Sequence, residues 1–160
     1  MTILRKLSSF QAPEKDMKQV YIADIRGLIE HSSNVWHSNL TIENENDLER
    51  AQKIALKIIL KDKFRNYENA LNIIKLDTLK YRRQKLCLAF AQKCLKNKKM
   101  KHLFPPNNKV HLKETRDMEH FKVFHANTER FKNGPIIYMQ NLLNTEVRRR
   151  IQQNENLMFD

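Results

Sequence analysis

The sequence contains little glycine, cysteine and proline, and each shortage excludes a class of protein. Its 160 residues include two glycines, two cysteines and four prolines. A glycine-rich phosphate loop and a dinucleotide-binding fingerprint both need several glycines at fixed spacing, so neither can be present. So few glycines and prolines also supply little turn chemistry for an all-β fold. Helix is therefore the expected secondary structure.

Long hydrophobic runs are missing as well. No stretch approaches the roughly 18 apolar residues that a membrane span needs, and the first residues are too polar for a signal peptide. Cys87 and Cys94 lie seven positions apart in a helical pattern. They could not easily bridge each other, so we expect reduced thiols. We therefore expect an intracellular protein, in the nucleus or the cytoplasm, with no membrane partner.

The cysteines and histidines lack the spacing of a metal site. Zinc sites usually contain close pairs such as Cys-x2-Cys and His-x3-5-His. Here six to eight residues separate consecutive members of the series Cys87, Cys94, His102, His111 and His120. Four residues separate His120 from His125, but no Cys-x2-Cys pair accompanies them. Both cysteines also fall in an apolar helical stripe, which favours core thiols over metal ligands. Cys94, beside Lys93, is the best candidate for a nucleophile, and a weak one. We expect no metal, no cofactor, no catalytic residue and no small-molecule substrate.

Apolar residues recur at helical spacing along most of the chain. Thr78 is a suitable N-cap, and the acids after Thr41 suit the start of a helix. We expect a mainly α fold, a small bundle of about four to five helices with an irregular C-terminal loop. Weak alternation at Phe121–Ala126 allows one short strand or hairpin. The expected helices cover residues 13–31, 41–60, 66–74, 78–97 and 136–143.

These patterns divide the chain into four parts. Residues 1–12 show no period and are expected to be a frayed segment. Residues 13–104 are expected to form the helical bundle. Residues 105–134 open with Pro105-Pro106 and read as a basic loop, exposed and mobile over 107–120. Residues 135–160 are expected to form a closing helix and a basic tail.

Basic residues outnumber acidic ones, 30 against 18, for a formal net charge of +12. From Lys80 to Lys113 there are eleven Lys and Arg and no Asp or Glu. Two interpretations stay open: a solvated charge run near a helix end, or contact with nucleic-acid phosphates, which the missing acids favour. Tyr67, Tyr81, Phe104 and Phe121 could stack on bases, but each fits a core better. The candidate phosphate contacts are Lys53, Lys57, Lys80, Arg82, Arg83, Lys85, Lys96, Lys98 and Lys99.

Several segments together show a resemblance to a known family. They are YIADIRGLIEHSSNVW (Tyr21–Trp36), LERAQKIALKIIL (Leu48–Leu60), YENAL (Tyr67–Leu71), LKYRRQKL (Leu79–Leu86), TERFKN (Thr128–Asn133) and Pro135–Asn144. In this order they resemble the region after the catalytic palm in reverse transcriptases of jockey-like non-LTR retrotransposons. The likeness covers about residues 17–144. One departure is Pro135, which stands earlier than the family's proline, before rather than after the apolar pair.

The resemblance implies the thumb and C-terminal connection of an RNA-directed DNA polymerase. A thumb is a helical bundle that holds the primer–template duplex by its backbone, so the implied partners are RNA, DNA or an RNA–DNA hybrid. The family's fingers, palm and aromatic-x-Asp-Asp motif do not occur in this sequence. We therefore expect a truncated retroelement product, part of a transposable element, with no polymerase activity by itself. The apolar first helix, with Tyr21, Ile25 and Trp36, would pack on a palm.

A second hypothesis belongs to a different class. The chain could be a helical protein-interaction module that docks on a reverse transcriptase palm or was co-opted by the host. Tyr21, Ile25 and Trp36 would then form a partner surface, and replacing Trp36 should change the oligomeric state without changing phosphate affinity. An independent enzyme is a third and weaker hypothesis, because no nucleophile, metal cluster or phosphate loop is recognisable.

Overall fold

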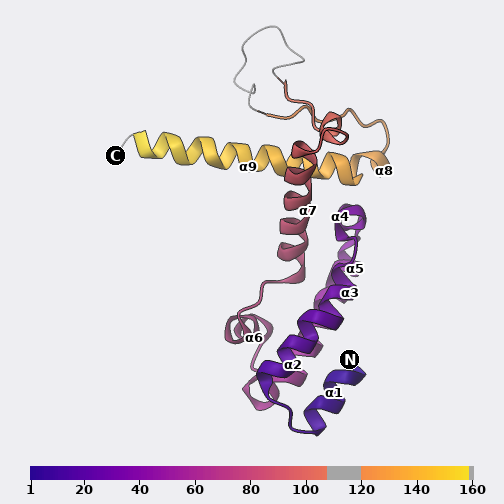
Figure 1. The fold of residues 1–160 in the computed structure, drawn as a ribbon, viewed down its shortest axis with the longest axis vertical. Coiled ribbons are helices and arrows are strands. Elements are labelled where there is room, and N and C mark those ends of the chain that lie inside the picture. The colour runs from indigo at the N-terminus through magenta and orange to yellow at the C-terminus, as the bar shows by residue number, and fades with distance from the viewer. Residues whose placement is uncertain (108–119, 159–160) are drawn as a thin grey trace. The chain divides into compact units, whose positions relative to one another are not determined.

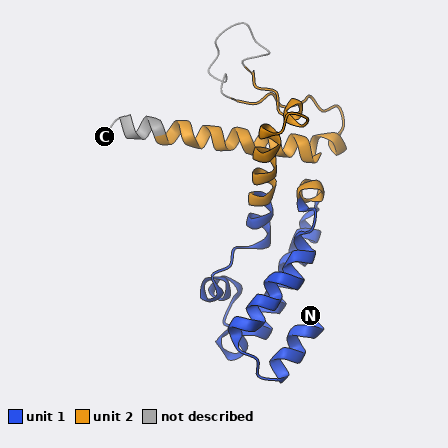
Figure 2. Cartoon of the chain, in the orientation of Figure 1, with its two compact units in different colours: residues 1–33, 40–84 blue, residues 34–39, 85–160 orange. Residues whose placement is uncertain are grey.

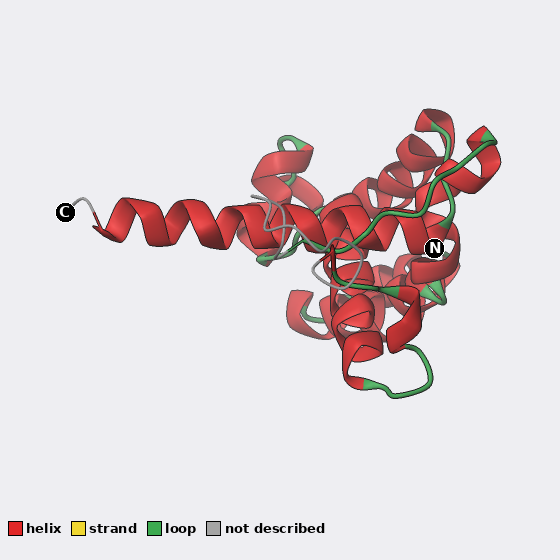
Figure 3. Ribbon diagram, turned by 90° about the horizontal axis from the view of Figure 1, so that it is seen from above, coloured by secondary structure: helices red, strands yellow, loops and turns green. Residues whose placement is uncertain are grey.

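The computed structural model of the chain describes residues 1–107 and 120–158, with side chains as far as residue 153. The described residues are mainly helical and contain no strand, which confirms the expected fold class (Figure 3). Short helices raise the number of helices above the four or five expected. The α-helices are α1 (Thr2–Ser9), α2 (Glu14–Val20), α3 (Gly27–Glu30), α4 (Ser33–Trp36), α5 (Ile42–Leu60), α6 (Tyr67–Ile74), α7 (Leu79–Lys96), α8 (Glu129–Lys132) and α9 (Pro135–Met158) (Figure 1).

Three helices begin at side-chain N-caps, of which only Thr78 was predicted as a cap. The side chains of Thr41, Asn66 and Thr78 accept hydrogen bonds from backbone N–H groups three residues on, at 3.2, 2.7 and 3.2 Å. Each bond satisfies one of the donors that a helix leaves unpaired at its N-terminus. The helices expected over residues 41–60, 66–74 and 78–97 are confirmed as α5, α6 and α7.

The helix expected over residues 13–31 is continuous from α2 to α3, but its middle is wider than an α-helix. Tyr21–Arg26 forms a π-helix, η1, between α2 and α3. Its first residue, Tyr21, is fully buried. A π segment adds a residue to the turn and re-aims the side chains that follow it. The helix ends at Glu30, and Ser32 then takes a positive φ of 51°.

The first residues are not a frayed segment, so that prediction was wrong. They form α1, which packs on α2 and α5, and Leu4 is fully buried. The helix is amphipathic, with Leu4 and Leu7 three residues apart on its packed side, a signal that the sequence-based expectation overlooked. Its stability comes from the packing of one apolar side rather than from helix propensity.

The chain divides into two compact units (Figure 2). Unit 1 contains residues 1–33 and 40–84, and unit 2 contains residues 34–39 and 85–160. The division falls inside α7, whereas the sequence placed all of residues 13–104 in one bundle. The periodicity of α7 is unbroken, so nothing in the sequence marks the point where its side chains change from one core to the other.

Each unit has its own hydrophobic core. In unit 1, α1, α2, η1, α5 and α6 contribute Leu4, Met17, Tyr21, Ala55, Leu56, Ile59, Leu60, Ala70, Leu71 and Ile74. In unit 2, the later part of α7 meets α9 through Cys87, Ala91, Cys94, Phe104, Met139 and Leu143. Cys87 and Cys94 are both buried, as their place in an apolar helical stripe predicts.

The short strand expected at Phe121–Ala126 does not form. Pro106 and Phe121 make one isolated antiparallel bridge. Side-chain amides of α9 hold the following backbone instead: Asn144 accepts from the Phe121 N–H at 2.7 Å and donates to its carbonyl at 2.9 Å. These amides occupy the backbone groups that a strand neighbour would need. The central part of the loop expected over 107–120, residues 108–119, lies outside the described residues.

Among the helices that the structure describes, none has both the length and the apolar content that crossing a bilayer would require.

Candidate nucleic-acid interface

Five exposed lysines gather where α7 ends, in unit 2. We call Lys93, Lys96, Lys98, Lys99 and Lys101 the α7-end cluster; all five side chains are exposed. Asn97 ends the helix, and its side chain accepts a hydrogen bond from the Lys99 N–H at 2.9 Å. Three members were among the predicted phosphate contacts. Lys93 and Lys101 were not, although the same acid-free run contains them.

A second basic surface lies on α5, in unit 1. Arg50, Lys53 and Lys57 are exposed, and together with Ile54 and Tyr67 they line a shallow hollow of about 540 Å³. The structure therefore places the predicted contacts Lys53 and Lys57 side by side. The predictions omitted Arg50, although its position, three and seven residues before the two lysines, indicates the same helix edge.

Two other predicted contacts, Lys80 and Arg82, already have acidic partners. Lys80 Nζ lies 2.8 Å from Glu45 Oε2, and Arg82 Nε lies 2.6 Å from Glu30 Oε1. The Lys80 pair is largely exposed, so it contributes little stability and can exchange for a phosphate. The Glu30 carboxylate is only 8% exposed, so separating it from Arg82 would leave a buried charge poorly compensated. The main role of Arg82 is therefore to pair with Glu30 rather than to contact a phosphate.

Arg83 was wrongly included among the candidate phosphate contacts. Its side chain is fully buried, so it presents no donor to a ligand outside the chain. A basic run shows that charge is abundant, but only the helix phase shows which member faces inward. Lys85, two residues further on, is exposed in unit 2.

The three residues proposed for partner packing do not form one exposed surface. Tyr21 is fully buried in the core of unit 1, which contradicts its proposed role. Ile25 is partly buried and packs against the same core. Trp36 is half-buried in α4. Most of the apolar stripe of residues 13–31 is therefore buried inside unit 1, whereas Leu28 is exposed.

A buried polar network holds α5, α6 and the start of α7 together in unit 1. The Tyr21 hydroxyl donates to Gln52 Oε1 at 2.6 Å, and Gln52 Nε2 donates to the Tyr67 oxygen at 2.9 Å. The Tyr67 hydroxyl donates to the Glu49 carboxylate, whose other oxygen accepts from the Lys80 N–H at 2.7 Å. Burial raises the pKa of both tyrosines, and the Glu49 carboxylate raises that of Tyr67 further. The network fixes the residues that flank the basic edge of α5.

Among the described residues, the structure gives little support to a metal site or to a cysteine nucleophile. Within residues 1–107 and 120–158, no group of three or more His, Cys, Asp or Glu could hold a metal ion. His111 lies outside those residues. Burial raises the pKa of the Cys94 thiol, which disfavours the thiolate that a nucleophile needs.

Two basic surfaces, one in each unit, thus remain from the predicted set, with Lys53 and Lys57 on the first and Lys96, Lys98 and Lys99 on the second. Comparison with known protein families, curated proteins and solved structures finds no match for this chain.

Proposed function

We propose that the chain binds the phosphate backbone of nucleic acids without reading base sequence. The observation that carries the proposal is the α7-end cluster. Five lysines are exposed within nine residues, and no acidic residue occurs between Lys80 and Lys113. Where no carboxylate competes, an incoming phosphate is the natural counter-ion.

The residue type supports backbone contact over base readout. All five members are lysines, compact charges on flexible stems that suit phosphate contact. Base-specific readout more often uses the planar, two-pronged donors of Arg, Asn or Gln. Each lysine that contacts a phosphate releases bound counter-ions, and this release supplies most of the affinity in sequence-independent binding.

We further propose that this binding is that of a reverse-transcriptase thumb and C-terminal connection, held against RNA, DNA or a hybrid duplex, with no polymerase activity by itself. The support is the ordered resemblance given above, together with the position of its segments on helices. The segment at Leu48–Leu60 lies within α5, and the segment at Leu79–Leu86 lies within α7. The proposed thumb thus offers the helical edges from which a duplex backbone is held.

The competing explanation is that the cluster only complements the negative end of the α7 dipole, which a basic residue in the last turn stabilises by about 0.3–1 kcal/mol. The two explanations predict different results for charge reversal. If the lysines serve only the helix end, their reversal lowers stability and leaves any binding unchanged.

The test measures binding of the full chain to a fluorescent RNA–DNA hybrid duplex. We expect the triple variant Lys96→Glu, Lys98→Glu, Lys99→Glu to bind at least tenfold more weakly than the wild type. The control is Arg5→Glu, Lys15→Glu, Lys122→Glu, which alters the net charge equally at exposed positions elsewhere. An equal loss of affinity in both variants would mean that net charge alone, and not the α7-end cluster, determines binding. No loss in the first variant would contradict the proposal.

A further inference from the structure

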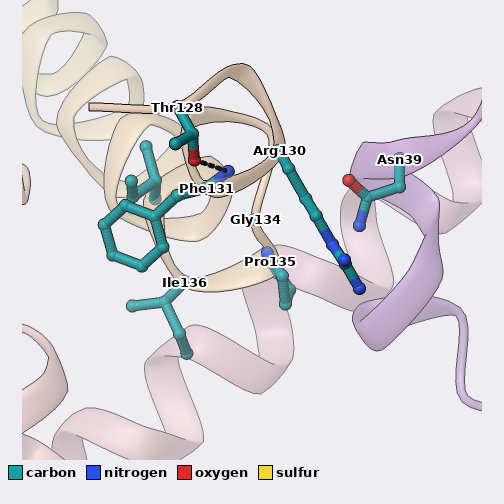
Figure 4. Close-up of a pocket in the computed structure, with 8 residues that line it drawn as sticks. Asn39, Thr128, Arg130, Phe131, Gly134, Pro135 and Ile136 are labelled. Carbon is teal, nitrogen blue, oxygen red and sulfur yellow. Dashed lines mark hydrogen bonds between the residues drawn. The ribbon is translucent and has the colours of Figure 1, made fainter. Parts of the chain in front are cut away.

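A hollow of about 340 Å³ opens beside the first turn of α9, within unit 2 (Figure 4). That volume is at the lower end of the range for small-molecule sites, about 300–1,000 Å³. The hollow is lined by Asn39, Thr128, Arg130, Phe131, Gly134, Pro135, Ile136 and Ile137. None of these residues belongs to the two basic surfaces described above.

One side of the hollow is apolar. Phe131 is 51% exposed, whereas Ile137, which also lines the hollow, is 4% exposed. Figure 4 shows the Phe131 ring beside Ile136. An accessible aromatic face next to apolar side chains is a platform on which a planar ring can stack.

The other side is polar. Figure 4 shows the Arg130 guanidinium and the Asn39 side-chain amide converging at the edge of the hollow, beyond Pro135. Among the described residues, neither side chain has a hydrogen-bond or ion-pair partner. The guanidinium offers donors and a positive charge, and the amide offers both a donor and an acceptor.

The walls are held in place by contacts outside the hollow. Thr128 caps α8 by accepting from the Phe131 N–H at 3.2 Å, which orients the aromatic residue. His37 Nε2 lies 3.1 Å from the Tyr138 hydroxyl, and the two rings meet edge to face. That contact fixes the segment that ends in Asn39 against α9. These contacts hold the backbone around the hollow, while the exposed Arg130 and Asn39 side chains keep the freedom to meet a ligand.

We propose that this hollow binds one unpaired nucleotide, with its base on Phe131, its base edge at Asn39 and its phosphate at Arg130. A ligand that satisfies both sides needs a flat aromatic face, a polar edge and a negative charge. An aliphatic ligand would leave the guanidinium and the amide without a partner, and an inorganic anion would leave the apolar side empty. The inference goes beyond the proposed function, because it assigns contact with a base to residues outside the lysine surfaces.

The test titrates the full chain with AMP and follows the backbone amide signals by NMR. We expect saturable shifts at residues 128–137 and Asn39, whereas inorganic phosphate alone at equal concentration produces none. Phe131→Leu keeps an apolar side chain but removes the ring, and it should weaken AMP binding roughly tenfold. Arg130→Gln should weaken it by a similar factor. The matched controls, Phe10→Leu and Arg65→Gln, alter exposed residues of the same types in unit 1 and should leave AMP binding unchanged.

Three results would overturn the inference: no saturable shifts, shifts confined to the α7-end cluster, or wild-type affinity in Phe131→Leu. A short acidic peptide containing leucine that fills the hollow while AMP does not would also overturn it and assign a peptide ligand instead. The result is separable from that of the proposed function. AMP binding at Phe131 can hold in a chain that does not bind the hybrid duplex, and the reverse is equally possible.

Discussion

At the residue scale, the two glycines differ in the space around them: Gly134 is crowded and Gly27 is open. A Cβ added to Gly134 would come within 2.8 Å of the Phe131 carbonyl oxygen, whereas one added to Gly27 would meet nothing within 4 Å. Gly134→Ala should therefore lower the free energy of unfolding by about 1–3 kcal/mol. Gly27→Ala, inside a continuous helix, should raise it by about 0.5–1 kcal/mol. Urea denaturation followed by circular dichroism measures both. A gain in stability from Gly134→Ala would contradict the described turn before α9.

The two cysteines are a second prediction at this scale. Cys87 and Cys94 are 1% and 2% exposed, and burial raises the pKa of the Cys94 thiol. Both factors slow the reaction of the thiol with an alkylating reagent. We expect labelling in the native protein to be at least a hundredfold slower than in urea-denatured protein, as measured by mass spectrometry. Rapid labelling of either native thiol would show that the core of unit 2 is open.

At the element scale, the network around Gln52 makes stability depend on alkaline pH. The folded state raises the pKa of Tyr21 and Tyr67 above the ordinary value of about 10, chiefly through burial. The folded state therefore retains protons that the unfolded state loses above that pH. This stabilisation is fully present below about pH 10 and is lost as the pH rises further.

Tyr67→Phe tests the network. The variant should lose about 1–2 kcal/mol at neutral pH, because Glu49 and Gln52 each lose a hydrogen-bond partner. It should also lose less stability than the wild type between pH 9 and about 11, because one perturbed tyrosine is gone. Tyr81→Phe, at an exposed tyrosine, is the control. Parallel pH profiles for Tyr67→Phe and the wild type would refute the assignment.

Long helices, whose apolar residues recur at helical spacing over many residues, were predictable from the sequence. Thr78 was predicted as an N-cap, and its side chain does cap the start of α7. Two features were not predictable from local pattern. The stability of α1 depends on packing, and the Phe121 backbone is held by Asn144, which is more than twenty residues away in sequence.

The candidate site shows the same division. The acid-free run correctly indicated exposed charge at Lys96, Lys98 and Lys99. The charge run alone does not show that Arg83 faces inward, although its spacing of four residues from Leu79 and Cys87 puts it on the buried side of α7. The pairing of Arg82 with Glu30 could not be predicted, because it depends on a tertiary contact. Nothing in the sequence patterns predicted the hollow beside Phe131. Asn39 and Arg130 are about ninety residues apart in sequence, so no local pattern brings them together.

At the scale of the whole molecule, a formal net charge of +12 is spread over two units with separate cores. Exposed lysines occur on α5 in unit 1 and at the end of α7 in unit 2. Each unit thus offers its own basic surface. Charge of this magnitude favours association with a polyanion, and the association weakens as added salt screens it.

The measurement that tests the central claim most directly is the salt dependence of wild-type binding to the RNA–DNA hybrid duplex. If the five lysines of the α7-end cluster contact phosphates, the logarithm of the association constant should fall linearly with the logarithm of salt concentration, with a slope of about −4 to −5. Reversal of Lys96, Lys98 and Lys99 should reduce the size of that slope by about 3. An affinity that is equal at low and high salt, or a slope that this triple reversal leaves unchanged, would contradict backbone-directed binding by the cluster.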